Sequence, residues 1–248
     1  MKKIIIIGAS SGMGMRIATD FARLGWRVGI AARREELLKT VKDQYPDRVE
    51  YMAIDVAAPD TAERFYKLIE LIDGMDVLLY AAGCGWYNPE LDLSDDERTV
   101  EVNVLGFTRI CNAAYRYFKD TANVTPGRIA AITSVAGVKG LGISAAYSAS
   151  KRYQWTYLQA LDQLAHQQHV NVGITDIRPG FVRTALLDKF KNPLPLEMSV
   201  DYVAPRIEAA ILQGRRIATI DSRWAVVSAL WRLIPAAAWR RVAVEMVP

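Results

Sequence analysis

The start of the chain combines three features that few folds accommodate together. Ile4 to Ile7 is a continuous β-branched run, as expected for a central strand of a parallel sheet covered on both faces. The turn Gly8-Ala9-Ser10-Ser11-Gly12-Met13-Gly14 follows, and then an amphipathic run from Met15 to Leu24 that Gly25 closes. Glycines allow a tight turn and a close backbone approach to a pyrophosphate, which sits at a helix N-terminus. Strand, turn and helix together predict a dinucleotide-binding start.

The glycine spacing narrows the class of nucleotide site. The pattern is G-x-x-x-G-x-G, rather than the commoner G-x-G-x-x-G. No Gly-Lys-Ser/Thr follows it, so the turn is not a phosphate-binding loop of the Walker type.

The end of the expected second strand, Arg27 to Ala32, bears on the choice of nicotinamide cofactor. An acidic residue at this point would hold the ribose 2′-hydroxyl of NAD. Arg33 and Arg34 stand there instead, with no carboxylate before Glu35. Because the planar guanidinium fork pairs with phosphate oxygens, the sequence predicts NADP(H), with Arg33 as the main contact. The alternative is that both arginines only solvate a helix start.

The rest of the chain alternates between strand-like and helix-like patterns. Further strands are expected at Val49–Ile54, Asp76–Tyr80, Arg128–Thr133, Val170–Ile177 and Arg216–Ile220. Helices are expected at Thr61–Ile72, from Ser94 to about Lys119, from Ser144 to about Gln168, and from Ser199 to about Gln213, where Pro205 predicts a kink. This alternation predicts an α/β domain over residues 1–221 and a helical tail over residues 222–248.

Tyr147 and Lys151 lie four residues apart on an expected helix, so they share one face. A free tyrosine has a pKa of about 10, and a fixed cation nearby favours the phenolate and lowers that pKa. The pair is therefore a candidate acid–base centre. The alternative is a surface lysine lying along a half-buried tyrosine.

Two more polar residues become candidates because of where they fall. Ser134 follows the strand Arg128–Thr133, at the carboxyl end where open α/β sheets bind their ligands, although serine is also ordinary turn chemistry. Asn103 lies among apolar residues of a helix, where a satisfied amide is the commoner explanation. A functional role for Ser134 or Asn103 is favoured only if the fold places the residue close to Tyr147.

Composition excludes several classes of function. The net charge of +4 and the scattered basic residues do not indicate a nucleic-acid partner. Cys84 and Cys111 show no metal or redox spacing, which suits a reducing cytoplasm. His166 and His169 have no third ligand, so no metal is expected. No run of about 20 apolar residues predicts a membrane-spanning helix.

Taken together, these motifs resemble the short-chain dehydrogenase/reductase family, over about residues 2 to 220. The matching positions are Gly8, Gly12, Gly14, Asp55-Val56, Asn103, Ser134, Tyr147, Lys151, Pro179-Gly180 and Thr184. The resemblance implies a single doubly wound α/β domain of the Rossmann type, with a seven-stranded parallel sheet. It also implies an oligomer, a homo-dimer or homo-tetramer.

The resemblance further implies roles for individual residues. Tyr147 would be the general acid in reduction and the base in oxidation, and Lys151 would lower its pKa and hold the nicotinamide ribose. Ser134 would bond the substrate oxygen, and Asn103 would support a water-linked proton path to Lys151. Asp55 would face the adenine, and Thr184 the carboxamide. The residues expected at the cofactor are Gly8, Ser10, Ser11, Gly12, Met13, Gly14, Arg33, Arg34, Asp55, Val56, Ala81, Ala82, Gly83, Tyr147, Lys151, Pro179, Gly180, Val182 and Thr184.

The chain departs from the family pattern at the end of the fourth strand. The family has Asn-Asn-Ala-Gly there, whereas this chain has Tyr80-Ala81-Ala82-Gly83. The lost amides put cofactor affinity in doubt. The small residues would still let the cofactor ribose and nicotinamide lie against the strand end.

The substrate side and the tail carry most of the unassigned apolar residues. An apolar pocket is expected from Cys84, Trp86, Tyr87, Leu141, Ile143, Phe181 and Leu186, with Ala185–Met198 as a mobile lid. In the tail, Trp224, Trp231 and Trp239 alternate with aliphatic residues and with Arg223, Arg232, Arg240 and Arg241. This composition fits a membrane-surface segment, a subunit contact or a cover over the substrate mouth, and the alternatives stay open.

The predicted function is an NADP(H)-dependent carbonyl reductase or alcohol dehydrogenase that acts on a small-molecule ketone or secondary alcohol, a lipophilic one if the tail meets lipid. The predicted location is the cytoplasm, with peripheral membrane contact as an option of the tail. The rival hypothesis is a non-catalytic NADP(H)-binding sensor or scaffold on the same fold. A sensor would have no use for Ser134, Tyr147 and Lys151 together.

Overall fold

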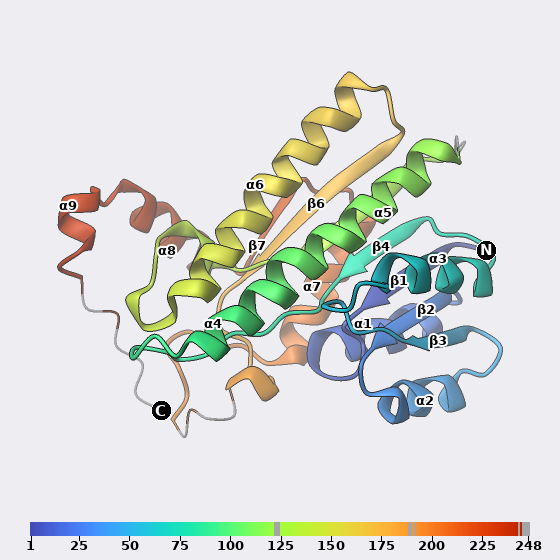
Figure 1. Ribbon diagram of the computed structural model, residues 1–248, viewed down its shortest axis with the longest axis horizontal. Helices are drawn as coiled ribbons and strands as arrows, with labels where there is room; N and C mark the ends of the chain where they lie inside the picture. Colours follow the sequence, from blue (N-terminus) through green and yellow to red (C-terminus); the bar gives the residue numbers. More distant parts are fainter. Residues whose placement is uncertain (122–124, 188–189, 191, 243, 245–248) are drawn as a thin grey trace.

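A seven-stranded parallel sheet forms the centre of the computed structural model, which describes residues 1–121, 125–187, 190, 192–242 and 244 (Figure 1). The strands are β1 (Lys3–Ile7), β2 (Arg27–Ala32), β3 (Val49–Ala53), β4 (Val77–Tyr80), β5 (Gly127–Ile132), β6 (Val172–Pro179) and β7 (Ile217–Ile220). Their order is β3-β2-β1-β4-β5-β6-β7, and every pairing is parallel. The order reverses between β1 and β4, which confirms the doubly wound Rossmann-like fold.

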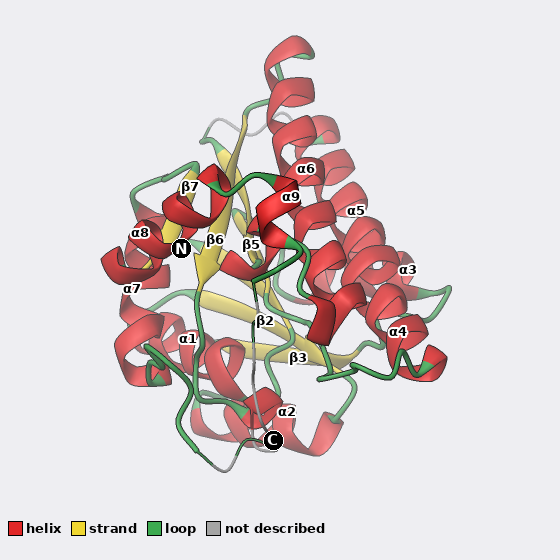
Figure 2. Cartoon of the chain, turned by 90° about the vertical axis from the view of Figure 1, so that its left-hand side faces the viewer, coloured by secondary structure: helices red, strands yellow, loops and turns green. Residues whose placement is uncertain are grey.

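Helices cover both faces of this sheet (Figures 1 and 2). One face carries α1 (Gly12–Arg23), α2 (Glu35–Gln44) and α7 (Val200–Leu212). The other carries α3 (Thr61–Leu71), α5 (Phe107–Asp120) and α6 (Ala145–Gln167). α4 (Leu93–Val100) precedes α5, and α8 (Ser222–Leu233) and α9 (Ala236–Trp239) follow β7.

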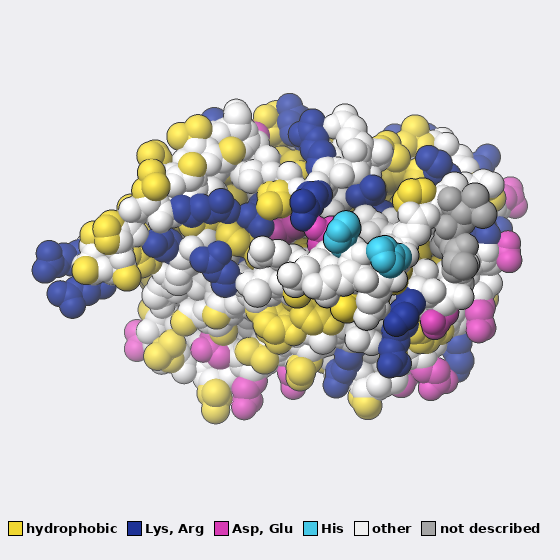
Figure 3. All heavy atoms as spheres, turned by 90° about the horizontal axis from the view of Figure 1, so that it is seen from above, with side chains coloured by type: hydrophobic (Ala, Val, Ile, Leu, Met, Phe, Trp, Pro, Cys, Tyr) yellow, Lys and Arg dark blue, Asp and Glu magenta, His cyan; other side chains and the backbone are white. Residues whose placement is uncertain are grey.

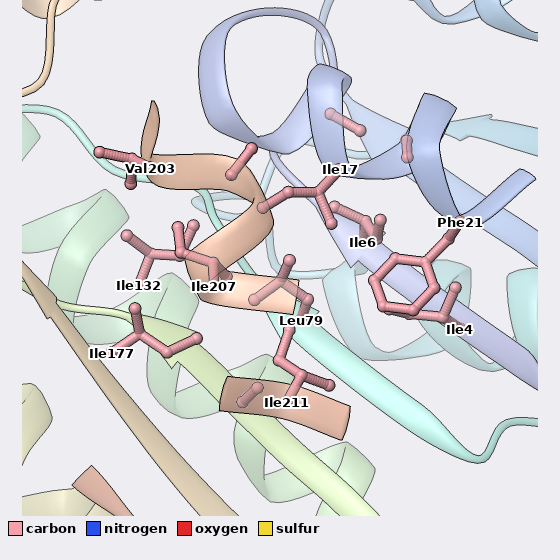
Figure 4. Packing of buried hydrophobic residues seen from close by; sticks show 14 of the residues in the cluster. Ile4, Ile6, Ile17, Phe21, Leu79, Ile132, Ile177, Val203, Ile207 and Ile211 are labelled. Atoms are coloured by element: carbon pink, nitrogen blue, oxygen red, sulfur yellow. The ribbon is translucent and has the colours of Figure 1, made fainter. Parts of the chain in front are cut away.

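The isoleucine run of β1 supplies both halves of the core. Ile4 and Ile6 belong to the cluster beneath α1 and α7, while Ile5 and Ile7 belong to the cluster beneath α3 and α5. Figure 4 shows the first cluster, in which Ile17, Phe21, Leu79, Ile207 and Ile211 surround these strand residues. Successive strand side chains point to opposite faces, so an unbroken apolar run is what a strand covered on both faces requires.

The long helix expected from Ser94 to Lys119 differs from the expectation in two ways. Its N-cap is Asp92, whose side chain accepts a hydrogen bond from the Ser94 amide at 2.9 Å. The helix is also divided, because α4 passes into a π-helical segment, η1 (Glu101–Gly106), before α5 begins. Such segments often accompany functional sites, and this one contains Asn103.

The expected cap at Ser199 is confirmed. Its hydroxyl accepts a hydrogen bond from the Tyr202 amide at 3.2 Å, and α7 continues through Pro205 to Leu212. Among the described residues, no helix is both long and apolar enough to cross a membrane.

Candidate functional site

One cleft of about 450 Å³ runs along the carboxyl ends of the strands and gathers the predicted cofactor residues. It is lined by Gly8, Ser10, Ser11, Gly12, Met13, Gly14, Arg33, Arg34, Asp55, Val56, Ala81, Ala82, Gly83, Tyr147, Lys151, Pro179, Gly180, Val182 and Thr184. Ser134 lines it too, whereas Asn103 lies behind it, fully buried. Residues far apart in the chain meet here because parallel strands all end at the same edge of the sheet.

The glycine-rich turn has no room for side chains at two positions. A Cβ on Gly8, whose φ is +93°, would lie 2.4 Å from the Ala82 amide nitrogen. A Cβ on Gly14 would lie 2.3 Å from the Gly8 carbonyl oxygen. The turn therefore packs directly against the backbone that follows β4, and the absence of a side chain at Gly8 permits that approach.

The two arginines after β2 have different surroundings. Arg34 Nη2 donates to the hydroxyls of Ser10 and Ser11, each at 3.0 Å, and so ties the end of β2 to the turn. Arg33 is exposed at the cleft wall. The sequence predicted Arg33 as the main cofactor contact. It did not predict the hydrogen bonds of Arg34 to the glycine-rich turn.

Asn103 fastens the loop that follows β4. Its Oδ1 accepts from the Cys84 amide at 3.0 Å, and its Nδ2 donates to the Cys84 carbonyl at 2.7 Å and to Ser150 Oγ at 3.0 Å. The side chain thus connects η1, the β4 loop and α6. All of its contacts are compatible with a structural amide, the commoner explanation.

Lys151 is held from its buried side. Its Nζ donates to Gln154 Oε1 at 3.1 Å and lies 3.4 Å from the Ile132 carbonyl oxygen. Gln154 Nε2 in turn donates to the Asn103 carbonyl at 2.9 Å. Burial disfavours the charged ammonium and lowers the pKa of Lys151 to about 8.

Tyr147 lies beside Lys151, whose Nζ is 5.6 Å from the centre of the phenol ring. Burial raises the pKa of Tyr147, and a hydrogen bond with Ser134 partly offsets this rise. The sequence predicted that Lys151 would lower this pKa. The pKa of Tyr147 is raised instead, because burial disfavours the phenolate more than the bond with Ser134 favours it.

A buried polar network supports the floor of the cleft. Thr133 Oγ1 donates to Asp176 Oδ1 at 2.6 Å and accepts from Trp155 Nε1 at 3.0 Å. Arg178 pairs with Asp176 at 2.6 Å and stacks 3.7 Å from the Trp155 ring centre. Sequence reasoning missed this network, since its members come from three elements that only the fold brings together.

Gly85 makes a contact with Tyr147 that the sequence did not predict. A Cβ there would lie 2.3 Å from the Tyr147 ring, so the glycine lets the β4 loop lie flat on the phenol. The glycines that follow β4 in the sequence were the only local indication of this close contact.

Apolar side chains also line the cleft. Five of the predicted residues line it, namely Cys84, Trp86, Tyr87, Leu141 and Phe181. Ile143 is not among the lining residues, and the side chain of Leu186 lies outside what the structure describes. The expected lid, Ala185–Met198, is described only in part, and Leu187 and Phe190 from it line the cleft.

The tail closes part of this cleft. Trp224 packs on Gly180, where a Cβ would lie 2.1 Å from the indole, and Trp231 lines the cleft. Lys139 Nζ donates to the Ile234 carbonyl and Trp239 Nε1 to the Gly140 carbonyl, both at 2.8 Å. The tail is therefore bound to the segment after β5 and supplies part of the lining of the cleft.

The two histidines come from the end of α6 and the turn after it. Among the residues that the structure describes, no three histidine, cysteine or acidic side chains are grouped to hold a metal ion.

Comparison with known proteins agrees with this arrangement. The family model described as short chain dehydrogenase matches residues 2–194. A farnesol dehydrogenase of Aedes aegypti is 30% identical over 196 residues, which cover 75% of this chain and 79% of that protein.

Solved structures share the fold. The 3-ketoacyl-(acyl-carrier-protein) reductase of Brucella melitensis, complexed with NADH, superposes with a TM-score of 0.78 at 23% identity, covering 89% of this chain and 96% of the other. ElxO with NADP bound gives 0.78 at 20% identity, covering 91% and 99%. With its sheet order, its glycine-rich turn and the family match over most of its length, this chain belongs to the short-chain dehydrogenase family of oxidoreductases.

Proposed function

We propose that the protein is an NADP(H)-dependent carbonyl reductase or alcohol dehydrogenase. The observation that carries the proposal is the meeting of Ser134, Tyr147 and Lys151 in one cleft with the glycine-rich turn. A pocket that joins a nucleotide cradle to a desolvated phenol and ammonium is suited to moving a hydride and a proton together.

The residues present fit a nicotinamide dinucleotide. The side-chain-free cradle of Gly8, Gly12 and Gly14 at the start of α1 would hold the pyrophosphate, and Asp55 and Thr184 would hold the two ends of the cofactor. Once bound, the nicotinamide supplies or accepts the hydride.

The protein's own groups handle the proton. In reduction, Tyr147 Oη donates its proton to the carbonyl oxygen of the substrate while Ser134 Oγ bonds the same oxygen as negative charge develops. The raised pKa keeps the phenol protonated near neutral pH, which suits reduction. Lys151 stabilises the phenolate that remains.

The preference for NADP(H) rests on the two arginines. Arg34, held by Ser10 and Ser11, and exposed Arg33 place two guanidinium groups beside the turn, with no carboxylate at the end of β2. A 2′-phosphate would satisfy that charge.

The substrate proposed is a lipophilic ketone or secondary alcohol. Aromatic and aliphatic side chains wall the far end of the cleft, including Tyr87, Leu141, Phe181 and Trp231. The name of the Aedes aegypti relative points to a long-chain isoprenoid alcohol as the substrate of that protein.

The proposal also covers assembly and location. We expect a homo-dimer or homo-tetramer in the cytoplasm, and the tail offers one contact surface. Val226, Leu230 and Leu233 form an exposed stripe on α8. Basic and apolar side chains share this end of the molecule (Figure 3).

Co-sedimentation with anionic liposomes would identify a membrane surface as the partner of this stripe, and gel filtration of the Leu230→Ser variant would identify a second subunit.

The central experiment follows NADPH and NADH consumption with ketones and aldehydes of graded chain length. Oxidation of NADPH that rises with chain length is the expected result. Binding of NADPH without turnover of any substrate would instead favour a sensor or scaffold.

A further inference from the structure

Gln154 is a buried polar residue for which the proposed chemistry has no role so far. It lies three residues after Lys151 on α6, so the two side chains share a helix face. Its side chain is 0% exposed. A buried amide is costly unless its donors and acceptors are used, so its contacts indicate what it does.

Both ends of the Gln154 amide are engaged, and each bond goes to a predicted catalytic residue. Oε1 accepts from Lys151 Nζ at 3.1 Å, and Nε2 donates to the Asn103 carbonyl at 2.9 Å. Asn103 lies in the π-helical segment and is 51 residues away in sequence. Gln154 therefore connects α6 to η1 directly behind the cleft.

This connection occupies the route that the family resemblance implies for a water-linked path between Lys151 and Asn103. A side-chain amide is fixed in orientation by its two bonds, unlike a water molecule. Its oxygen accepts a stronger hydrogen bond from an ammonium than from a neutral amine, so it favours the ammonium form of Lys151.

The geometry leaves one direction open to the ammonium. Of the three donors of Lys151 Nζ, one is taken by Gln154 and another points towards the Ile132 carbonyl at 3.4 Å. The cleft and Tyr147 lie on the remaining side.

Other ionisable groups around Lys151 do not replace this bond. Cys84, from the β4 loop, favours the charged ammonium only when it is a thiolate, and burial raises its pKa to about 11. Asp176, from β6, is already paired with Arg178 at 2.6 Å. Tyr147, on α6 itself, is a neutral phenol until it ionises.

We propose that Gln154 is a positioning residue that anchors the Lys151 ammonium to the Asn103 peptide oxygen and holds it charged beside Tyr147. The proposal rests on the proposed function for its catalytic meaning. The anchoring itself can be measured in the protein without turnover.

The test compares Gln154→Leu and Gln154→Glu with the wild type. In ¹⁵N-lysine-labelled protein, the Nζ resonance of Lys151, assigned with Lys151→Arg, is followed against pH. Gln154→Leu removes the acceptor, so the pKa of Lys151 should fall by about one unit. Gln154→Glu keeps the shape and adds a carboxylate, so the same pKa should rise. Gln163→Leu, at an exposed position of α6, should change nothing.

The pH profile of alcohol oxidation gives a second readout. With Lys151 neutral over more of the range, the phenolate of Tyr147 is less stabilised in Gln154→Leu. The pH at which oxidation reaches half its plateau should therefore move up by about one unit, a tenfold loss of rate below that pH. Carbonyl reduction at low pH, where the phenol is protonated, should stay within about twofold of the wild type.

The outcomes separate the two proposals. An unchanged Lys151 titration in both variants, or an equal loss of rate at every pH in both directions, would reduce Gln154 to a packing residue. If Gln154→Leu does not fold, the rise expected in Gln154→Glu decides the question alone. If the pKa of Lys151 falls in Gln154→Leu and rises in Gln154→Glu while the wild type turns over no substrate, the anchoring role is supported and the proposed enzyme activity is overturned.

Discussion

Tyr147, Lys151 and Ser134 are individually ordinary residues that line one cleft, and burial changes the acid–base properties of the first two. Burial raises the pKa of the Tyr147 phenol and lowers that of the Lys151 ammonium, so each group is shifted towards its neutral form. At neutral pH these shifts keep the phenol protonated, and they make the ammonium easier to deprotonate than it is in water.

Removal of the Tyr147 hydroxyl tests the proposed acid. Tyr147→Phe should lower kcat by roughly 100-fold or more, because the substrate oxygen loses its proton donor. NADPH binding, measured by fluorescence, should persist. Tyr153→Phe, which removes a more exposed hydroxyl of the same helix, serves as the control and should retain activity. Turnover that survives in Tyr147→Phe would assign the acid to another group.

Reversal of charge at Arg33 tests the cofactor preference. Arg33→Asp should weaken NADPH binding by about 10- to 100-fold and leave NADH binding nearly unchanged, because only NADPH carries the 2′-phosphate. Arg34→Ala should weaken both cofactors, since Arg34 also holds Ser10 and Ser11. The measurement is the dissociation constant of each cofactor, with Arg116→Asp on α5 as a charge-matched control. An equal loss of both cofactors in Arg33→Asp would contradict the assignment.

At the scale of elements, the contact between α1 and α7 contains an uncompensated acidic group. Asp20 of α1 pairs with Arg16 at 2.6 Å and with Arg23 at 3.0 Å. Glu208 of α7 lies against Asp20, with which it shares a hydrogen bond only when protonated, and otherwise its buried Oε1 has no hydrogen-bond partner among the described residues. Burial, followed by the charge of Asp20, raises the pKa of Glu208 from 4.5 to about 7.

This shift predicts a pH-dependent stability. Between about pH 4.5 and 7 the folded state binds more protons at Glu208 than the unfolded chain, so stability falls as pH rises through that window. Glu208→Gln should therefore raise stability at pH 8 by roughly 1 kcal/mol, a value reduced because the group is partly solvated, and by nothing at pH 4.5. Thermal unfolding at both pH values checks this, with exposed Glu97→Gln as the control. A gain of equal size at both pH values would rule out titration as the cause.

At the scale of the whole molecule, the tail is divided between core and surface. Trp224 is buried in the cluster beneath α7, whereas α9 touches the body through the bond from Trp239 to Gly140. A boundary at residue 221 therefore cuts through packed structure, although the sequence predicted a separate tail from residue 222.

Two truncations should show this division. A chain that ends at Ile234 keeps Trp224 and should fold with little loss of stability. A chain that ends at Asp221 loses the buried indole and should be destabilised by about 3 kcal/mol or more, because a cavity opens over Gly180. Denaturant unfolding of both chains and the full-length protein gives the comparison. Equal stability of the two shortened chains would mean that Trp224 contributes little to the core.

The local patterns of the sequence were enough to predict the architecture. The β-branched run at Ile4–Ile7, the glycine spacing and the Tyr147–Lys151 interval each fix a conformation within a few residues. The family resemblance implied seven parallel strands, and the structure supplies their order and brings the expected cofactor residues together at the strand ends.

The contacts between distant segments were decided only by the tertiary structure. The bridge of Gln154 to Asn103, the choice of Arg34 rather than Arg33 to bind the turn, and the packing of Trp224 on Gly180 leave no mark in local periodicity. Burial also reversed the expected direction of the Tyr147 pKa. Sequence determines local conformation through short-range sterics and hydrogen bonds, whereas desolvation and long-range pairing depend on which surfaces meet when the sheet closes.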